Sequence, residues 1–271
     1  MRLFDSHAHL GAPELFPEAG ALLERARESG VVGVIAVGAG YGVGPNGAAV
    51  ALAEQHPDVW ASAGVHPHDA KEWDALAAQA IDGWLAHSRV VAVGECGLDY
   101  WYEYSPREAQ RECLRAQIGL AHAHALPLVL HVRPSRDTRD AFEDLLQIFD
   151  EAGAERAGGV IHCFTGDRRF AEDCLARNFD ISFSGILTFK NADDLRDVAR
   201  ALPLERLMIE TDSPLLAPVP RRGKRNEPSF LAHVATCLAE LRGVTPDVIA
   251  DATAERARAR FGLHGPAGTA Q

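Results

Sequence analysis

Short apolar runs alternate with longer amphipathic stretches along nearly the whole chain. The apolar runs show little strict alternation of polar and apolar residues, which is typical of parallel strands buried on both faces. We predict eight strands, at residues 2–6, 31–37, 59–65, 90–94, 127–130, 159–161, 180–183 and 206–209. Amphipathic helices are predicted between and after them, at residues 18–29, 48–55, 73–87, 107–124, 141–152, 170–178, 193–201, 229–242 and 246–260.

Eight strand–helix units in 271 residues favour an α/β fold of the (β/α)8 TIM-barrel class, which typically needs about 250 residues. We expect residues 1–262 to form this single domain and residues 263–271 to form a short disordered tail. The structural alternative is a doubly wound open sheet, which gathers its ligands at one switch point. Polar residues here end strands one, four, five, six and eight, and only a closed ring brings all of those ends together.

The chain carries a net charge of −11, from 27 Lys and Arg against 38 Asp and Glu. This balance argues against a tight nonspecific binder of DNA, which would be basic, but not against phosphodiester chemistry at metal ions. Five scattered cysteines without CxxC spacing argue against a disulfide framework or a zinc knuckle and favour a reducing, cytoplasmic setting. We expect no membrane-spanning segment and no signal peptide.

Polar side chains with metal-binding chemistry stand at the predicted strand ends. His7 and His9 leave the first strand two residues apart, so their imidazoles point to the same face. In a barrel, such strand ends meet at the C-terminal mouth, where TIM-barrel enzymes keep their sites. The residues that would meet there are His7, His9, Glu95, His131, His162 and Asp212.

Four imidazoles and two carboxylates exceed what one zinc ion needs, and they suit two divalent ions bridged by a carboxylate. Mixed nitrogen and oxygen ligands fit Zn, Mn, Fe or Ni, and Mg less well. Two such ions deprotonate a shared water near neutral pH, and the resulting metal-bound hydroxide is the nucleophile. Asp212 is the carboxylate best placed to accept that proton. A second HxH, at His122 and His124, lies on a predicted helix, where residues two apart do not share a face.

A series of short motifs covers nearly the whole chain. They are Asp5-Ser6-His7-Ala8-His9-Leu10, Gly64-Val65-His66-Pro67-His68, Gly94-Glu95-Cys96-Gly97-Leu98-Asp99-Tyr100, Leu130-His131-Val132-Arg133, His162-Cys163-Phe164-Thr165-Gly166, Glu210-Thr211-Asp212-Ser213-Pro214 and Arg222-Gly223-Lys224-Arg225-Asn226-Glu227-Pro228. In kind and order, these motifs resemble those of the TatD-type metal-dependent deoxyribonucleases, a branch of the amidohydrolase superfamily.

This resemblance implies a barrel, two divalent metals and hydrolysis of phosphodiester bonds, commonly in DNA from an exposed 3′ end. It also implies which residues hold each ion: His7, His9 and Asp212 one, His131 and His162 the other, with Glu95 bridging as a ligand with a catalytic role. Two positions depart from the family pattern. Pro134 follows Arg133 where an acidic residue is usual, and Arg256 stands where an asparagine is usual.

Substrate contacts are expected around the mouth. Arg133 lies two residues past His131 and is the predicted phosphate contact, within a local rim of basic residues. His66 ends the third strand and is predicted to hydrogen-bond a substrate oxygen or a metal-bound water. The aromatic run at residues 100–102 either packs the barrel rim or stacks a base, and the packing role is slightly favoured.

The leading hypothesis is a cytoplasmic two-metal hydrolase, most simply a monomer, that cleaves phosphodiester bonds in DNA as a 3′–5′ exonuclease-like deoxyribonuclease. The first alternative is an amidohydrolase that cleaves a small amide, ester or lactone at the same metal centre, because a fold and its ligands do not fix the substrate. The second is a non-catalytic binding module on a barrel scaffold. The complete set of ligands speaks against this last interpretation.

Overall fold

The computed structural model describes residues 1–263, whose strands form one eight-stranded parallel sheet in the order β1 to β8. Each strand pairs in parallel with the next strand along the chain. The strands are β1 Leu3–Ala8, β2 Val31–Val37, β3 Val59–Ala63, β4 Val90–Asp99, β5 Leu128–Arg133, β6 Gly159–Ile161, β7 Phe179–Phe183 and β8 Leu207–Ile209.

Backbone contacts between residues 7–9 and residues 212–213 close the sheet into a barrel. Ala8 forms a parallel bridge with Ser213, just beyond the end of β8. The His9 N–H donates to the Ser213 carbonyl at 2.8 Å, and the Asp212 N–H donates to the His7 carbonyl at 2.9 Å. The predicted (β/α)8 barrel is therefore confirmed, and the open-sheet alternative is wrong.

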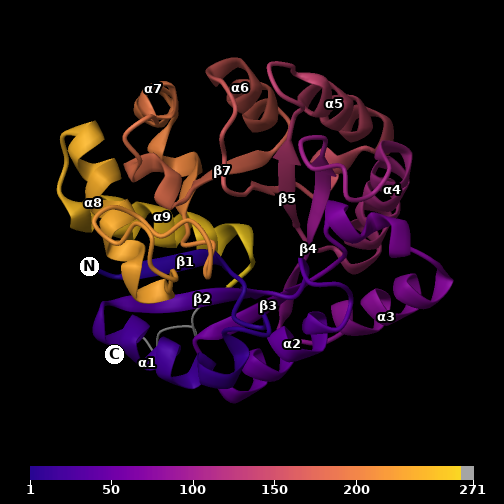
Figure 1. Cartoon of the computed structure of the whole chain (residues 1–271), viewed down its shortest axis with the longest axis horizontal. Coiled ribbons are helices and arrows are strands. Elements are labelled where there is room, and N and C mark those ends of the chain that lie inside the picture. Colours follow the sequence, from indigo (N-terminus) through magenta and orange to yellow (C-terminus); the bar gives the residue numbers. More distant parts are fainter. Residues whose placement is uncertain (264–271) are drawn as a thin grey trace, which may run out of the picture.

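Helices surround the strands (Figure 1). They are α1 Ala19–Glu28, α2 Pro45–Gln55, α3 Ala75–Leu85, α4 Arg107–His124, α5 Asp140–Ala152, α6 Arg168–Ala176, α7 Asp193–Ala201, α8 Leu231–Arg242 and α9 Pro246–Arg260. Several of their ends follow ordinary capping chemistry. The Asp74 side chain accepts hydrogen bonds from two N–H groups at the start of α3, and Gly153 and Gly243 end α5 and α8 in the left-handed conformation.

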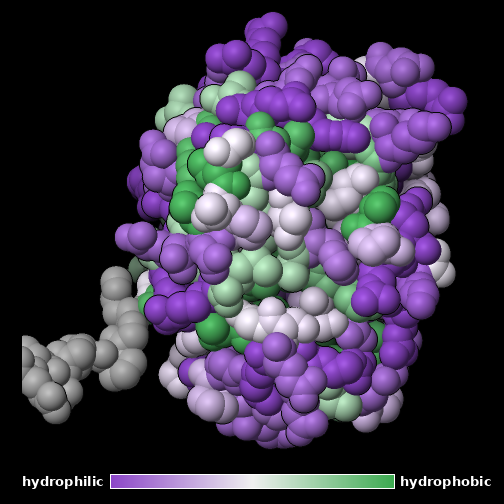
Figure 2. Space-filling model, turned by 90° about the vertical axis from the view of Figure 1, so that its left-hand side faces the viewer, coloured by the Kyte–Doolittle hydropathy of each residue, from purple (hydrophilic) through white to green (hydrophobic). Residues whose placement is uncertain are grey.

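The apolar core has two layers, as expected for parallel strands covered on both faces. The larger layer lies between strands and helices, and includes Leu114 of α4 and Ile181 of β7. The smaller layer lies inside the barrel, where Phe4 and Met208 pack with Ala257 of α9 and with Phe261, the residue that follows this helix. Figure 2 shows the outside of one side of the molecule, where hydrophilic side chains cover most of the surface and hydrophobic patches lie between them.

Three strands extend further toward the mouth than predicted. The first strand ends at Ala8 instead of residue 6, the fourth continues through Glu95 to Asp99 instead of stopping at residue 94, and the fifth ends at Arg133 instead of residue 130. Irregular pairing explains the error at β4, as described below. Of the predicted tail, residues 264–271 lie outside the described residues, and Leu263 is buried in the inner core layer.

None of the helices within residues 1–263 is long and apolar enough to cross a membrane. All five cysteines are free thiols.

A buried carboxylate at the base of the barrel explains one departure from the family pattern. Asp180 of β7 is fully buried and accepts hydrogen bonds from Arg206, Arg256 and Arg260 at 2.6 to 2.7 Å. Arg256 and Arg260 lie on α9, while Arg206 ends the short helix η5 Leu204–Arg206 before β8. Arg256 therefore ties α9 to the barrel, away from the strand ends that carry the candidate ligands.

Replacing this carboxylate tests the tie between α9 and the barrel. Asp180→Ala leaves the guanidinium groups without their buried counter-charge, and we expect the free energy of unfolding to fall by about 3–5 kcal/mol in urea denaturation. Asp197→Ala is the matched control: Asp197 pairs with Arg200 in an exposed position, and its loss should cost less than about 1 kcal/mol. Equal effects of the two variants would contradict a structural role for Asp180.

Candidate metal centre

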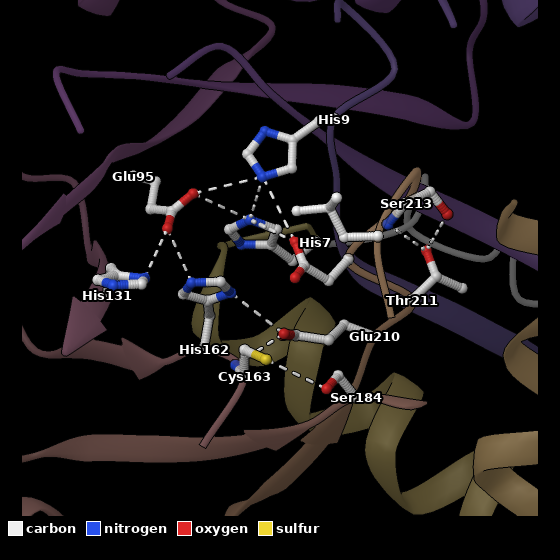
Figure 3. A network of polar contacts seen from close by, with 12 residues as sticks. His7, His9, Glu95, His131, His162, Cys163, Ser184, Glu210, Thr211 and Ser213 are labelled. Atoms are coloured by element: carbon white, nitrogen blue, oxygen red, sulfur yellow. Dashed lines mark hydrogen bonds and ion pairs between the residues drawn. The ribbon is translucent and has the colours of Figure 1, made fainter. Parts of the chain in front are cut away.

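The six predicted ligands converge at the mouth of the barrel, five of them drawn and labelled in Figure 3. They come from strands far apart in the sequence, and every one except His131 is buried. The structure also brings His66 into the same cluster. The side chains form three groups whose ligand atoms lie close enough to hold a metal ion: His7, His9 and Glu95; His7, His162 and Asp212; and His66, Glu95 and His131.

His7 in β1 and His9 just after this strand face each other and two carboxylates. His7 Nε2 and His9 Nε2 lie 3.2 Å apart. Both nitrogens approach Glu95 Oε2, at 3.2 Å and 3.5 Å, and His9 Nε2 also lies 3.4 Å from Asp212 Oδ1. The predicted convergence of the HxH pair is confirmed. Pairing between β1 and β2 is irregular between Asp5 and Ala8, so the pair does not depend on a regular strand.

Glu95 reaches the centre because β4 bulges at this residue. Gly94 pairs with Val129 and Cys96 pairs with Leu130, the next residue of β5, so Glu95 has no partner in the register. Such an extra residue bends a strand and redirects its side chain. The flanking backbone requires glycine: Gly97 has φ +142°, and a Cβ there would lie 1.8 Å from the His131 carbonyl oxygen.

The two carboxylate oxygens of Glu95 face different sets of histidines. Oε2 faces His7 and His9, whereas Oε1 lies 2.8 Å from His162 Nε2 and 3.2 Å from both His131 Nδ1 and His66 Nε2. A carboxylate with one oxygen toward each set has the geometry of a bridging ligand.

The charges in this cluster favour a cation. Burial opposes ionisation of Glu95, but the surrounding imidazoles, His162 first, hold the pKa of its carboxyl well below the usual value. Burial likewise opposes protonation of His162, yet Glu95 and Glu210 raise the pKa of this imidazole well above its usual value. Burial would raise the pKa of Asp212 as well, and the hydrogen bond from His9 lowers it.

Buried acceptors set the tautomers of three histidines. His9 Nδ1 donates to the Ala39 carbonyl at 3.1 Å, and His162 Nδ1 donates to Glu210 Oε1 at 3.1 Å. His131 Nε2 donates to Asp99 Oδ2 at 3.0 Å. In the neutral form, each ring then turns a lone pair toward Glu95. These outer partners orient the rings as second-sphere carboxylates and carbonyls do in metal sites.

His66, unlike these three histidines, turns a protonated nitrogen toward Glu95. Its Nδ1 accepts a hydrogen bond from the His68 N–H at 3.1 Å, and burial lowers the pKa of His66 to about 4. A neutral ring with an accepting Nδ1 carries its proton on Nε2. His66 is therefore near enough to be a ligand, but its tautomer suits a hydrogen-bond donor better.

The donor set fits divalent metal ions. Glu95 Oε2 and His162 Nε2 are buried, and neither has a hydrogen-bond partner within residues 1–263, although His162 Nε2 lies 2.8 Å from Glu95 Oε1. Buried polar atoms normally have partners, so these two atoms are available to a cation. Imidazole nitrogens and carboxylate oxygens are ligands that Zn, Mn, Fe and Ni accept.

Two functional carboxylates were missed by the sequence analysis. Glu210 accepts from His162 Nδ1 and from the Cys163 N–H at 2.7 Å, and Asp99 accepts from His131 and from His68 Nε2 at 3.0 Å. Both are fully buried. Their signal was present, since Glu210 stands two residues before Asp212 and Asp99 four residues after Glu95, but only three-dimensional contacts reveal their partners.

The Asp212 carboxylate sits on a constrained turn after β8. Its φ of 57° lies in the left-handed region, which aspartate tolerates better than most residues. Asn226 is buried and donates from Nδ2 to the carbonyls of Thr211 and Leu215, at 2.7 and 2.6 Å. These two hydrogen bonds hold the loop that follows β8.

The predicted basic rim divides into paired and aromatic-packed residues. The Arg133 guanidinium carbon lies 4.7 Å from the centre of the Trp101 ring, and that of Arg222 lies 3.8 Å from the Phe189 ring. Arg139 and Arg225 instead pair with acidic side chains. On α4, His122 contacts the Gly153 carbonyl and His124 contacts Asp82, away from the cluster.

A sequence model of the family described as TatD related DNase matches residues 4–262. The chain belongs to this family. Its membership makes it a TatD-family metal-dependent hydrolase.

Similar proteins match nearly all of this TatD-family chain. The uncharacterized metal-dependent hydrolase YabD of Bacillus subtilis is 41% identical over 97% of this chain and 100% of its own. The 3′–5′ ssDNA/RNA exonuclease TatD of Erwinia amylovora is 37% identical over 96% of this chain and 100% of its own. The crystal structure of YJJV, a TatD homologue from Escherichia coli, superposes with a TM-score of 0.88 at 30% identity, covering 97% of this chain and 99% of that one.

The orienting role of Glu210 can be measured without catalysis. Glu210→Gln removes the anionic acceptor of His162 at nearly constant volume, and we expect affinity for Zn²⁺ or Mn²⁺ to fall about 10- to 100-fold in calorimetric titration of metal-free protein. The matched control is Ser184→Ala, which removes a neighbouring buried hydroxyl that contacts Cys163 Sγ at 3.2 Å. Loss of affinity in the control but not in Glu210→Gln would refute the assignment.

Proposed function

We propose that this protein holds two divalent ions at the barrel mouth and hydrolyses phosphodiester bonds of single-stranded nucleic acid from the 3′ end. One observation carries the proposal: the two carboxylate oxygens of Glu95 face separate sets of histidine nitrogens, at distances of 2.8 to 3.5 Å. One ion would be held by His7, His9 and Asp212, the other by His131 and His162, with Glu95 between them.

Charge balance supports two ions. Four carboxylates of the cluster and its outer partners are buried, namely Glu95, Asp99, Glu210 and Asp212. Imidazoles that ligate a metal are neutral, so the four carboxylates of a loaded centre carry about four negative charges. Burying such charge without compensation is very unfavourable. Two divalent cations balance it, whereas one leaves half of it uncompensated.

Bound divalent ions would supply a water of lowered pKa and would neutralise charge on the phosphodiester. Burial opposes ionisation of Asp212, but the surrounding histidines hold the pKa of its carboxyl below the usual value, so the carboxylate can accept a proton from the attacking water. The Nε2–H of His66 points into the centre and can donate to a phosphoryl or leaving oxygen. Arg133 lies at the rim as a counter-charge for a neighbouring phosphate.

The substrate class rests on relatives and on the rim. The Erwinia amylovora relative is named a 3′–5′ ssDNA/RNA exonuclease, and it aligns with nearly all of this chain. Arg133 at the end of β5 and Arg222 in the loop after β8 place positive charge on an otherwise acidic protein. Four further points stay predictions. They are the identity of the metal among Zn, Mn, Mg, Ni and Fe, the monomeric state, the domain boundary at residue 262 and the cytoplasmic location.

The bridging role of Glu95 gives the most direct functional test. Wild-type protein should hydrolyse single-stranded DNA or RNA with added Mn, Mg or Zn and leave small amides and lactones intact. Glu95→Ala should bind neither ion, measured as metal per protein by mass spectrometry, and should lose hydrolysis by at least about 10³-fold. Bound metal and full turnover in this variant would rule out the two-metal proposal, and preferred cleavage of an amide or lactone would replace the nuclease with an amidohydrolase.

The base role of Asp212 predicts a split between kinetic constants. Asp212→Asn keeps the side-chain shape and removes the proton acceptor, so kcat should fall by about 10²- to 10⁴-fold while KM changes little. Initial rates on a single-stranded oligonucleotide at several metal concentrations separate this effect from weaker metal binding. A parallel loss in kcat and in substrate affinity would speak against Asp212 as the base.

A further inference from the structure

The loop that joins β4 to α4 displays aromatic rings to solvent beside the metal centre. Trp101, Tyr102 and Tyr104 are 41%, 47% and 58% exposed. Within residues 1–263, five large aromatic side chains are at least 38% exposed, and three of them fall within four consecutive positions. Contiguous exposed apolar surface of this kind usually marks a binding site. The sequence had slightly favoured a packing role for residues 100–102, yet only Tyr100 is buried.

Two arginines cover part of this surface. The guanidinium carbon of Arg133 lies 4.7 Å from the centre of the Trp101 ring and 5.0 Å from that of Tyr102. Arg136 lies 5.3 Å from Trp101. Neither arginine forms an ion pair with a carboxylate in the described part of the chain, so their positive charges remain available to an anionic ligand. We call Trp101, Tyr102, Tyr104, Arg133 and Arg136 the aromatic platform.

Buried hydrogen bonds hold the aromatic platform in place. Asp99 Oδ1 accepts from the N–H groups of Trp101 and Tyr102, at 3.0 and 2.8 Å. Gln110 of α4 is fully buried, donates to the carbonyls of Asp99 and Ser105, and accepts from the Asp99 N–H at 2.7 Å. The rings therefore stand on a fixed turn, so ordering them on binding costs little conformational entropy.

The same aspartate connects the platform to the metal centre. While Asp99 Oδ1 caps the aromatic turn, Oδ2 accepts from His131, a candidate ligand, and from His68. Ring contacts continue outward: the His68 ring centre lies 6.2 Å from that of His131 and 4.8 Å from that of Tyr104. Tyr102 and Tyr104 then stack 5.3 Å apart at an interplanar angle of 16°. Two ring contacts therefore link Tyr104 of the platform to His131, whose Nδ1 lies 3.2 Å from Glu95 Oε1.

We propose that the aromatic platform stacks unpaired bases of a single-stranded nucleic acid while Arg133 and Arg136 contact its phosphates. This inference rests on the proposed function in placing the scissile phosphate at Glu95. Aromatic faces next to guanidinium groups are the combination that binds single strands without reading sequence. Bases of a duplex are already stacked and paired, so the platform selects single strands. The net charge of −11 confines such binding to this local patch.

Binding, measured apart from hydrolysis, tests the platform. In an Asp212→Asn background with Mn²⁺, Trp101→Ala and Tyr102→Ala should each raise Kd for a fluorescent single-stranded oligonucleotide about 10- to 100-fold in anisotropy titrations. Tyr102→Phe keeps the ring and should stay within about threefold of the parent. Val248→Ala is the control, because Val248 is 45% exposed on α9, a helix that packs against η5 before β8. Its Kd should match the parent.

The outcomes separate this inference from the proposed function. A blunt duplex should bind at least about tenfold more weakly than a single strand, and parallel DNA and RNA arms show which sugar is preferred. Unchanged Kd in both alanine variants, or tighter binding of duplex than of single strand, overturns the platform. Wild-type protein that binds single strands through the platform but cleaves none leaves this inference intact and contradicts the proposed nuclease.

Discussion

A buried, ionised carboxylate at the bulge within β4 is the constraint on which the rest of the centre depends. Glu95 sits out of register with β5 and presents one oxygen to His7 and His9 and the other to three further imidazoles. A charge in this position is unfavourable unless cations surround it. The residues around it lower the pKa of the carboxyl, and the same negative field attracts a metal ion.

The same backbone contacts close the barrel and bring candidate ligands together. The hydrogen bond from the Asp212 N–H to the His7 carbonyl seals β1 against the end of β8, and it sets two candidate ligands side by side. Around them, Glu210 and Asp99 accept protons from the outer nitrogens of His162 and His131. Because each ring is held from behind, the inner nitrogens keep their lone pairs toward Glu95, as a preorganised metal site requires.

The fold and the ligand positions followed from the chain alone, because parallel strands buried on both faces leave apolar runs and the polar residue after each run must lie at one mouth. The bulge at Glu95 could not be predicted, since it depends on the register of β4 against β5, which local sequence does not specify. The roles of Glu210, Asp99 and the His66 tautomer depend on contacts between distant strands. The exposed rings of the aromatic platform likewise required the buried support of Gln110.

The division of Glu95 between two ions is most directly tested by anomalous diffraction from crystals loaded with Mn²⁺. The account predicts two anomalous peaks about 3.5–4 Å apart. One should lie between Glu95, His7, His9 and Asp212, and the other between Glu95, His131 and His162. A single peak, or two peaks with Glu95 bound to neither or to one alone, would contradict it.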